Sequence, residues 1–124
     1  MKIENFEDIE AWQEARSLTN TIYNFTTDGE FSKDYGLRDQ IQRASVSIMA
    51  NIAEGFDSNT NKSFVNFLGY ALRSATEVQS HLYVALDQNY ITKEEFKKIY
   101  NKTKEVKKLI SGFKRYLANS DRDS

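Results

Sequence analysis

The stretch that decides the fold is Leu37-Arg-Asp-Gln-Ile-Gln-Arg-Ala-Ser-Val-Ser-Ile-Met-Ala-Asn-Ile-Ala-Glu-Gly55. At about 100° per residue, a helix over this stretch is apolar on two opposite sides. One side carries Leu37, Ile41, Ala44, Ile48 and Ile52, and the other carries Val46, Met49, Ala50 and Ala53. A small bundle covers one side of a helix with its own core. The second side therefore predicts an interface with another copy of the chain.

Length and composition set the outer limits. The chain has 124 residues and no cysteine, which fits one domain that buries its core without disulfides or a metal. No apolar run approaches the roughly 20 residues that span a bilayer, and the residues after Met1 lack the pattern of a secretory leader. We expect a cytoplasmic protein with no membrane contact.

Periodicity predicts four helices, at about residues 6–26, 33–54, 61–87 and 93–118. The chain contains no proline, and its glycines mostly separate periodic segments. Either Ser32 or Asp34 would cap the second helix, and Gly55 would end it in a left-handed conformation. Thr92 and Glu95 have the spacing of a capping box at the start of the fourth helix.

The third helix carries the most regular apolar stripe. Its members are Phe64, Leu68, Ala71, Ala75, Val78, Leu82 and Ala85. This repeat predicts packing at shallow crossing angles, and short connections make consecutive helices antiparallel. The expected fold is all-α: a single-domain, up-down-up-down antiparallel four-helix bundle over residues 1–118, followed by a flexible tail over residues 119–124.

Four motifs carry a resemblance to a known family. They are Gln40-Ile41-x-Arg43-Ala44, Asn51-Ile-Ala-Glu-Gly55, Phe67-Leu68-x-x-Ala71 and Ser74-x-x-Glu77. They resemble the 23S rRNA-intervening sequence proteins, also called S23 ribosomal proteins, and the likeness extends over nearly the whole chain. The resemblance implies a bacterial four-helix bundle that assembles into a ring-like homo-oligomer, with a homopentamer as the expected form. Most members have no established activity.

A second likeness bears on partners. The accessory variability determinant of diversity-generating retroelements is similar, and it is a basic barrel that engages nucleic acid and a reverse transcriptase. This chain departs from the family pattern, with Gln42 where a second basic residue is frequent and Arg73 where glycine is frequent. Its net charge of −1 also lacks the basic excess of a dedicated nucleic-acid binder. Both observations argue against a nucleic-acid partner without excluding one.

Positive charge is nevertheless concentrated on the expected fourth helix. The candidate nucleic-acid-binding residues on one flank of this helix are Lys93, Lys97, Lys104, Lys107, Lys108 and Arg115. Such a flank could contact phosphates of RNA or DNA. Its commoner role is a solvated face, or a partner for the acidic residues Glu7, Glu10 and Glu14, which antiparallel packing would bring near. The sequence leaves both interpretations open.

Polar residues between the apolar sides form a second candidate cluster. Its members are Arg43, Asn51 and Glu54 on the second helix, and Ser74 and Glu77 on the third. We expect a structural polar network in which Arg43 pairs with Glu54 or Glu77. The alternative uses both carboxylates as metal ligands or as acid and base. Di-iron bundles require Glu-x-x-His, whereas His81 follows Glu77 by four residues, so no metal is expected.

No other pattern predicts catalysis or a cofactor. The chain has one histidine, no cysteine, no Gly-x-Ser-x-Gly motif and no phosphate-binding glycine loop, so we expect no catalytic and no cofactor-binding residue. The phenylalanines fall mostly at core positions, whereas Tyr35, Tyr70, Tyr83, Tyr90 and Tyr116 could lie at subunit boundaries.

The sequence as a whole favours a non-catalytic, oligomeric binding or scaffolding module. The leading specific partner is RNA, DNA or a ribonucleoprotein bound through basic surfaces. The alternative is a purely structural protein–protein interaction module that binds no nucleic acid, in which the partner is another protein.

Overall fold

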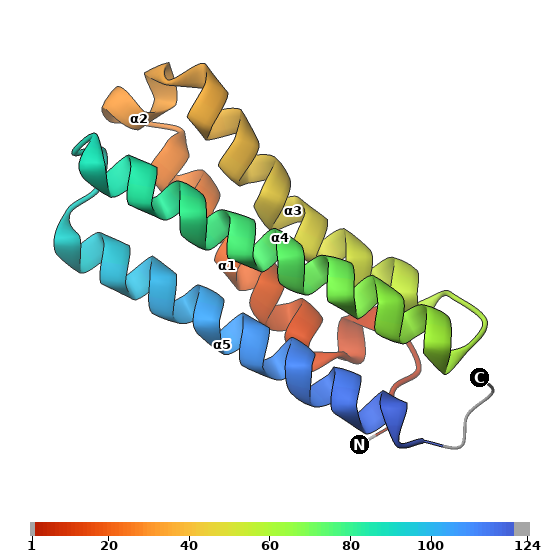
Figure 1. Cartoon of the computed structure of the whole chain (residues 1–124). Coiled ribbons are helices and arrows are strands. Elements are labelled where there is room, and N and C mark those ends of the chain that lie inside the picture. The colour runs from red at the N-terminus through yellow and green to blue at the C-terminus, as the bar shows by residue number, and fades with distance from the viewer. Residues whose placement is uncertain (1, 121–124) are drawn as a thin grey trace.

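A computed structural model describes residues 2–120, and this part of the chain contains helices and no strand. The four long helices are α1 (Glu10–Thr26), α3 (Tyr35–Phe56), α4 (Asn61–Asp87) and α5 (Lys93–Ala118) (Figure 1). A 3₁₀ turn, η1 (Phe6–Asp8), precedes α1, and the short helix α2 (Gly29–Lys33) connects α1 to α3. Within residues 2–120, no helix has both the length and the apolarity that crossing a bilayer requires.

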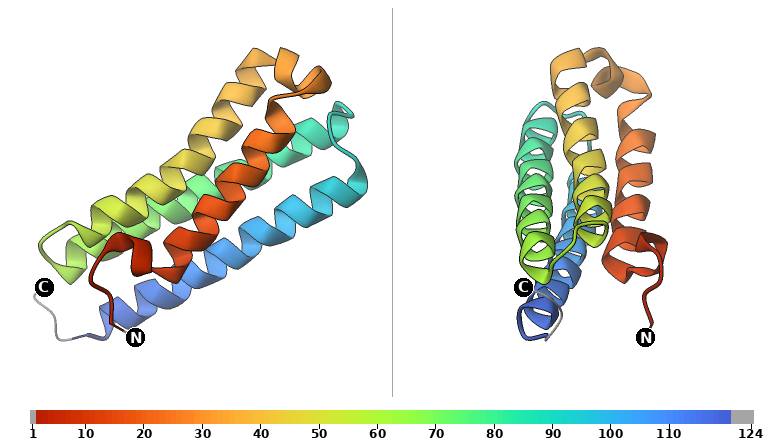
Figure 2. Two further views of the ribbon diagram at one scale, coloured as in Figure 1. Left: turned by 180° about the vertical axis from the view of Figure 1, so that it is seen from behind. Right: turned by 90° about the vertical axis from the view of Figure 1, so that its right-hand side faces the viewer.

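The long helices lie side by side, and each runs opposite to the long helix before it (Figures 1 and 2). Helix α3 packs against α1 and α4, and α5 packs against α4 and α1, so that every long helix has two neighbours. The start of α1 and the end of α5 lie at the same end of the bundle (Figure 2). The predicted all-α helical bundle is confirmed.

Each long helix buries one apolar stripe in a common core. The buried residues include Ala11, Ala15, Leu18 and Ile22 from α1, Leu37, Ile41, Ala44, Ile48 and Ile52 from α3, Phe64, Leu68, Ala71, Ala75, Val78, Leu82 and Ala85 from α4, and Ile99, Val106, Ile110 and Leu117 from α5. These stripes are the ones that helical periodicity predicts. Burial of each large aliphatic side chain contributes about 1.5–3 kcal/mol.

The bounds predicted for α4 and α5 agree with the structure because capping signals mark their ends. The Thr60 hydroxyl accepts a bond from the Ser63 amide over 3.1 Å at the start of α4. At the start of α5, Thr92 and Glu95 form the predicted capping box, with reciprocal bonds of 3.1 Å and 2.8 Å. Each bond satisfies an amide that the first helical turn leaves free.

The predicted start of the first helix is wrong, whereas the second helix has one of its two predicted caps, Asp34, and begins two residues later than predicted. Ile9 is extended (φ −80°, ψ 119°) and buried, so the chain forms η1 and then begins α1 at Glu10. The second predicted helix corresponds to α3, which begins at Tyr35, and the separate short helix α2, which the sequence did not predict, ends just before it at Lys33. The Asp34 carboxylate caps α3 by accepting a 3.1 Å bond from the Leu37 amide.

Gly55 does not end α3 in a left-handed conformation, and that prediction is also wrong. The helix continues to Phe56, and Asp57 follows it with right-handed dihedrals (φ −79°, ψ −7°). Gly55 instead permits close approach of α3 and α4. A Cβ atom at this position would lie 2.6 Å from Cδ1 of Phe64 and 2.9 Å from Cβ of Phe67.

Candidate nucleic-acid interface

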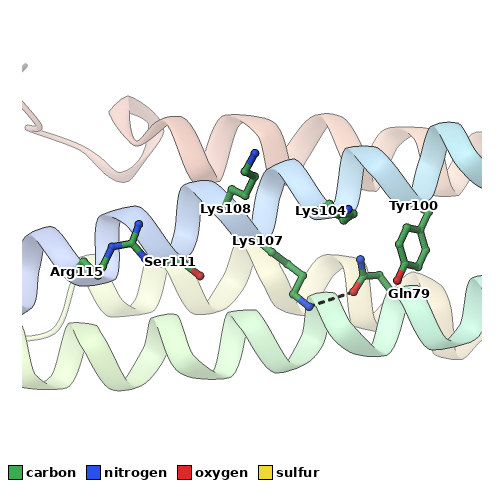
Figure 3. A pocket seen from close by; sticks show the side chains of 7 residues that line it. All are labelled: Gln79, Tyr100, Lys104, Lys107, Lys108, Ser111 and Arg115. Atoms are coloured by element: carbon green, nitrogen blue, oxygen red, sulfur yellow. Dashed lines mark hydrogen bonds between the residues drawn. The ribbon is translucent and has the colours of Figure 1, made fainter.

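The main hollow beside the candidate residues is a groove along α5, bordered by α4. Its volume is about 570 Å³ (Figure 3). The lining residues are Gln79 from α4 and Tyr100, Lys104, Lys107, Lys108, Ser111 and Arg115 from α5. Four of the six candidate cations therefore line one groove, which we call the basic groove. The lining includes no aspartate and no glutamate.

The register of α5 places these cations on the surface. Ile99, Val106 and Ile110 are fully buried and point into the core. Thr103 is also buried, and its hydroxyl donates to the Ile99 carbonyl over 2.8 Å, so a polar residue is accommodated in the apolar stripe. At about 100° per residue, the positions between stripe residues turn away from the core to different degrees. Lys104, which follows Thr103, and Lys108, two residues after Val106 and two before Ile110, are exposed, whereas Lys107, which follows Val106, is half-buried.

Lys107 connects the two helices that border the basic groove. Its Nζ donates to the Thr76 hydroxyl over 3.0 Å and to Oε1 of Gln79 over 3.1 Å (Figure 3). Both acceptors are neutral, so these bonds position the ammonium group without cancelling its charge. Gln79 itself is buried, with 8% of its surface exposed. The groove thus holds one cation in a fixed place.

The remaining cations of the stripe have little pairing within the chain. Lys108 pairs with Glu105 over 3.8 Å, and both side chains are mostly exposed (76% and 68%). An exposed pair of this kind contributes about 0–1 kcal/mol. Between residues 2 and 120, Lys93, Lys97, Lys104 and Arg115 form no ion pair.

The acidic residues of the first segment make no direct ion pair with this stripe in the described residues, although Glu10 and Lys108 line one hollow. Glu7, Glu10 and Glu14 form no ion pair with α5 in the described part of the chain, although α1 and α5 are neighbours. Within residues 2–120, the predicted pairing of the two helices is therefore not seen as ion pairs.

Lys93 and Lys97 lie beyond the groove, in the first turns of α5. They are exposed and do not line the 570 Å³ hollow. Beside them, Phe96 and Tyr100 of α5 pack against Tyr83 of α4. The pKa of Tyr83 is raised, first by the charge that Tyr100 would carry on ionisation, then by partial burial and the Tyr100 hydroxyl. The Tyr83 hydroxyl is therefore neutral at the near-neutral pH values at which nucleic-acid binding is measured.

Sequence reasoning missed Gln79, Thr76 and Ser111. Gln79 follows the core residue Val78, and polar neighbours of core positions are frequent on any amphipathic helix. Only the packing of α4 against α5 brings Gln79 to the cations. Tyr100 had a usable signal, because it occurs three residues after Lys97 and four before Lys104, which places all three on one flank.

The predicted polar network forms only in part. Asn51 donates to the carbonyl and hydroxyl of Ser47 over 2.9 Å and 3.1 Å, and the Ser74 hydroxyl donates to that of Ser47 over 2.9 Å. The Ser74–Ser47 bond joins α4 to α3, whereas both Asn51 bonds lie within α3. The predicted ion pair of Arg43 with Glu54 or Glu77 does not form within one chain. Arg43 and Glu54 are exposed, and neither makes an ion pair within the described chain.

The metal alternative for the two carboxylates has no supporting geometry in the described residues. Glu77 pairs with His81 over 3.3 Å along α4, which leaves Glu54 outside that pair. Across residues 2–120, no three histidine, aspartate or glutamate side chains lie together as a metal site requires.

The candidate interface residues on α3 differ in exposure. Val46 is exposed, with 43% of its surface accessible, whereas Met49, Ala50 and Ala53 are half-buried. Met49 packs partly against the core of its own bundle. Val46 is therefore the member of this set that is most available to a second chain.

Comparison with known proteins identifies a family and a solved structure that this chain resembles. The sequence profile of the 23S rRNA-intervening sequence proteins matches residues 7–112. The chain belongs to this family. A crystal structure of an S23 ribosomal protein family member of unknown function from Bacteroides thetaiotaomicron is 27% identical. It superposes with a TM-score of 0.78 and covers 85% of this chain and 95% of that one. No protein with a curated description matches the chain.

The block Asn51-Ile-Ala-Glu-Gly55, which suggested the 23S rRNA-intervening sequence family, has a physical role at most of its positions. Asn51 bonds to Ser47, Ile52 is fully buried, and Gly55 allows α3 to approach α4. Ala53 is half-buried on the second side of α3. Glu54 is exposed and has no ion pair among the described residues. Most of the motif therefore specifies how two helices pack.

Proposed function

We propose that this protein is a non-catalytic, self-assembling module that binds RNA or DNA through the basic groove of α5. The observation that carries the proposal is the lining of that groove. Lys104, Lys107, Lys108 and Arg115 line it, no carboxylate does, and one weak surface ion pair involves these cations within residues 2–120. A phosphate backbone is the ligand that such a surface attracts most strongly.

The net charge of −1 is compatible with this proposal because local charge governs the contact. Screening limits the reach of a surface charge to about 8 Å at physiological ionic strength. The acidic residues of α1 form no ion pair with the stripe within residues 2–120, although Glu10 and Lys108 line a neighbouring hollow between α1 and α5. A polyanion lying along α5 therefore experiences mainly the cations of the groove.

Self-assembly would strengthen this binding. We propose a ring-like homo-oligomer because the second side of α3 exposes Val46 and half-exposes Met49, Ala50 and Ala53. A homopentamer is the form that the resemblance to the 23S rRNA-intervening sequence proteins implies. Cyclic symmetry would repeat the basic groove on every subunit. Several weak sites on one ring would then hold a long nucleic acid by avidity.

The direct test replaces Lys97, Lys104 and Lys108 together with glutamine and measures RNA binding at several salt concentrations. Log affinity falls linearly with log salt, by about 0.7–0.9 for each phosphate contact. The triple variant should therefore flatten the slope by about 2 and weaken binding at low salt. Light scattering should give the same mass as for the parent protein, because these side chains are exposed.

A matched control keeps the total charge change constant. Arg16, Lys33 and Lys62 are also exposed cations, and they lie on α1, α2 and α4 outside the groove. Their replacement with glutamine should leave the slope unchanged. If both triple variants weaken binding equally, the attraction is non-specific and the basic groove has no special role. If the parent protein does not retain RNA or DNA at low salt, the proposal is wrong.

A protein partner is the second candidate function. It is favoured by the exposed apolar positions Val46 and Val84, each with 43% of its surface accessible. In that case the protein would assemble through α3 and α4 without binding nucleic acid. Light scattering that shows an oligomer, together with no RNA or DNA retention, would support this alternative.

A further inference from the structure

We propose that the basic groove receives an unpaired segment of nucleic acid, with one base stacking on an aromatic cluster at the end of the groove. The cluster consists of Tyr83, Phe96 and Tyr100. This inference rests on the proposed function and specifies the form of the ligand: a single strand of RNA or DNA in preference to a duplex.

The cluster joins α4 to α5 through close ring contacts. Phe96 and Tyr100 stack with centroids 5.3 Å apart and an interplanar angle of 28°. Tyr83 lies 4.9 Å from Phe96 and 5.8 Å from Tyr100. Half of the surface of Tyr83 remains accessible, so the cluster is not sealed into the core. An exposed ring supported by two others is a rigid surface on which a base can stack.

The cluster is continuous with the basic groove. Tyr100 lines the groove and points toward Gln79, at the end opposite Arg115 (Figure 3). Lys97 and Lys104 lie about one helical turn before and after Tyr100, on the same flank of α5. From Tyr100 to Arg115 the helix rises about 22 Å, enough for several nucleotides. The aromatic cluster therefore lies at one end of a row of cations on one surface.

This combination distinguishes an unpaired strand from a duplex. Single-strand binding sites pair a positive groove that follows the backbone with aromatic side chains that stack on bases. In a duplex the base faces are already stacked on one another, so an aromatic ring outside it gains nothing beyond the phosphate contacts. A surface used only for duplex phosphates would not need an exposed ring, Tyr83, beside its lysines.

The sequence alone suggested another role for Tyr83, as a residue at a subunit boundary. The two roles differ in what Tyr83 contacts, which is a second chain in one case and a base in the other. Substitution of Tyr83 would change the mass of the oligomer only if the boundary role is correct.

The experiment measures fluorescence anisotropy with labelled strands of about 20 nucleotides. The probes are oligouridine RNA, oligothymidine DNA, an abasic DNA strand and an RNA duplex of equal length. The parent protein should bind both single strands about tenfold more tightly than the abasic strand, because stacking contributes affinity for each base that meets a ring. Oligouridine and oligothymidine should bind alike, since stacking does not distinguish the two sugars.

Variants separate the ring from the charges. Tyr83→Leu should weaken oligouridine binding about tenfold and leave abasic binding and the salt slope unchanged. Tyr83→Phe keeps the ring and should bind as the parent does. Tyr35→Leu is the matched control, because Tyr35 is 66% exposed on α3, which borders neither α5 nor the groove.

The two proposals fail in different ways. If abasic and base-containing strands bind equally, or if Tyr83→Leu binds as the parent does, the stacking inference is wrong. The basic groove stands in that case, provided that the triple lysine variant still flattens the salt slope. If Tyr83→Leu changes the oligomer mass, Tyr83 belongs to a subunit boundary and the inference is again overturned. If the lysine variant changes nothing, the proposed function itself is wrong.

Discussion

Gly55 controls how closely two helices approach at a single residue. Alanine is normally better than glycine inside a helix by about 0.5–1 kcal/mol, and Gly55 lies within α3. Here, however, a methyl group would lie 2.6 Å from the Phe64 ring and 2.9 Å from the Phe67 Cβ. The second of these atoms is attached directly to the backbone of α4 and cannot swing away. Steric overlap therefore outweighs the helical preference.

We predict that Gly55→Ala lowers the free energy of unfolding by about 1–2 kcal/mol, because overpacking typically costs about 1–3 kcal/mol. Gly112→Ala is the control within α5, where the nearest atom to an added Cβ is a flexible Arg115 nitrogen at 3.9 Å. It should raise stability by about 0.5–1 kcal/mol. Urea denaturation of both variants gives the comparison. A stabilised Gly55→Ala protein would contradict the close approach.

For single residues, the sequence predicts which side chains are buried better than it predicts which side chains they contact on other helices. The spacing of Ile48 and Ile52 predicted that both are buried, because helical periodicity depends on the helix alone. The role of Gly55 and the partners of Lys107 depend on distances between helices. The same limit explains Arg43, whose predicted ion pair required a neighbour that packing did not supply.

Among the secondary-structure elements, Asp34 connects the start of α3 to the turn between α4 and α5. Its Oδ1 caps α3 by accepting from the Leu37 amide, and its Oδ2 accepts a 3.0 Å bond from the Tyr90 hydroxyl. The Tyr90 ring also stacks on Phe31 of α2, with centroids 5.3 Å apart. One carboxylate thus joins the α2–α3 corner to the turn between α4 and α5.

The Tyr90–Asp34 bond predicts a dependence of stability on alkaline pH. The bond to Asp34 is the first cause that raises the pKa of Tyr90 above 10.0, because it favours the neutral phenol. A folded-state pKa above the unfolded value gives stability that is complete below about pH 10 and lost as pH rises through the folded pKa.

Tyr90→Phe should therefore be less stable than the parent from neutral pH to about pH 9, by a constant difference. The difference should shrink above about pH 10. Thermal denaturation across this range is the measurement, and Tyr116→Phe, an exposed tyrosine on α5, is the control. A difference that grows with pH would show that the hydroxyl does not donate to Asp34.

Element boundaries were predictable where the chain carries a capping residue. Thr60 and Thr92 mark the starts of α4 and α5, and both helices have the predicted bounds. The break at Ile9 was harder to predict, since Asn5 and Asp8 cap η1 but an isoleucine beside charged residues is compatible with a continuous helix. It is extended because its side chain packs into the core while the preceding residues form η1.

For the whole molecule, the sequence predicted a basic flank but not its surroundings. The order of residues placed the cations on one side of α5. Whether α1 neutralises them depended on side-chain positions across two helices, and the absence of ion pairs there favours a surface open to a ligand. The aromatic cluster could not be predicted from the sequence for the same reason, because Tyr83 lies on α4 and its two partners lie on α5.

The side of α3 that carries Val46 and Met49 is the surface through which we expect the protein to assemble. Val46 is a large apolar residue with 43% of its surface exposed, whereas Met49 packs partly on its own core. A charge at Met49 would disturb folding as well as assembly. A charge at Val46 tests assembly more cleanly, because its solvent-facing position tolerates a polar side chain in the monomer.

We predict that Val46→Glu dissociates the oligomer into monomers and leaves the helical circular dichroism unchanged. Placing an unpaired carboxylate in an apolar interface has a desolvation cost that assembly would have to overcome, and cyclic symmetry repeats this cost at every contact. Asn20→Glu adds the same charge at an exposed position of α1 and should keep the parent mass. Light scattering at micromolar concentration measures both. A monomeric parent protein, or a Val46→Glu variant that retains the parent mass, would show that this side of α3 is not the interface.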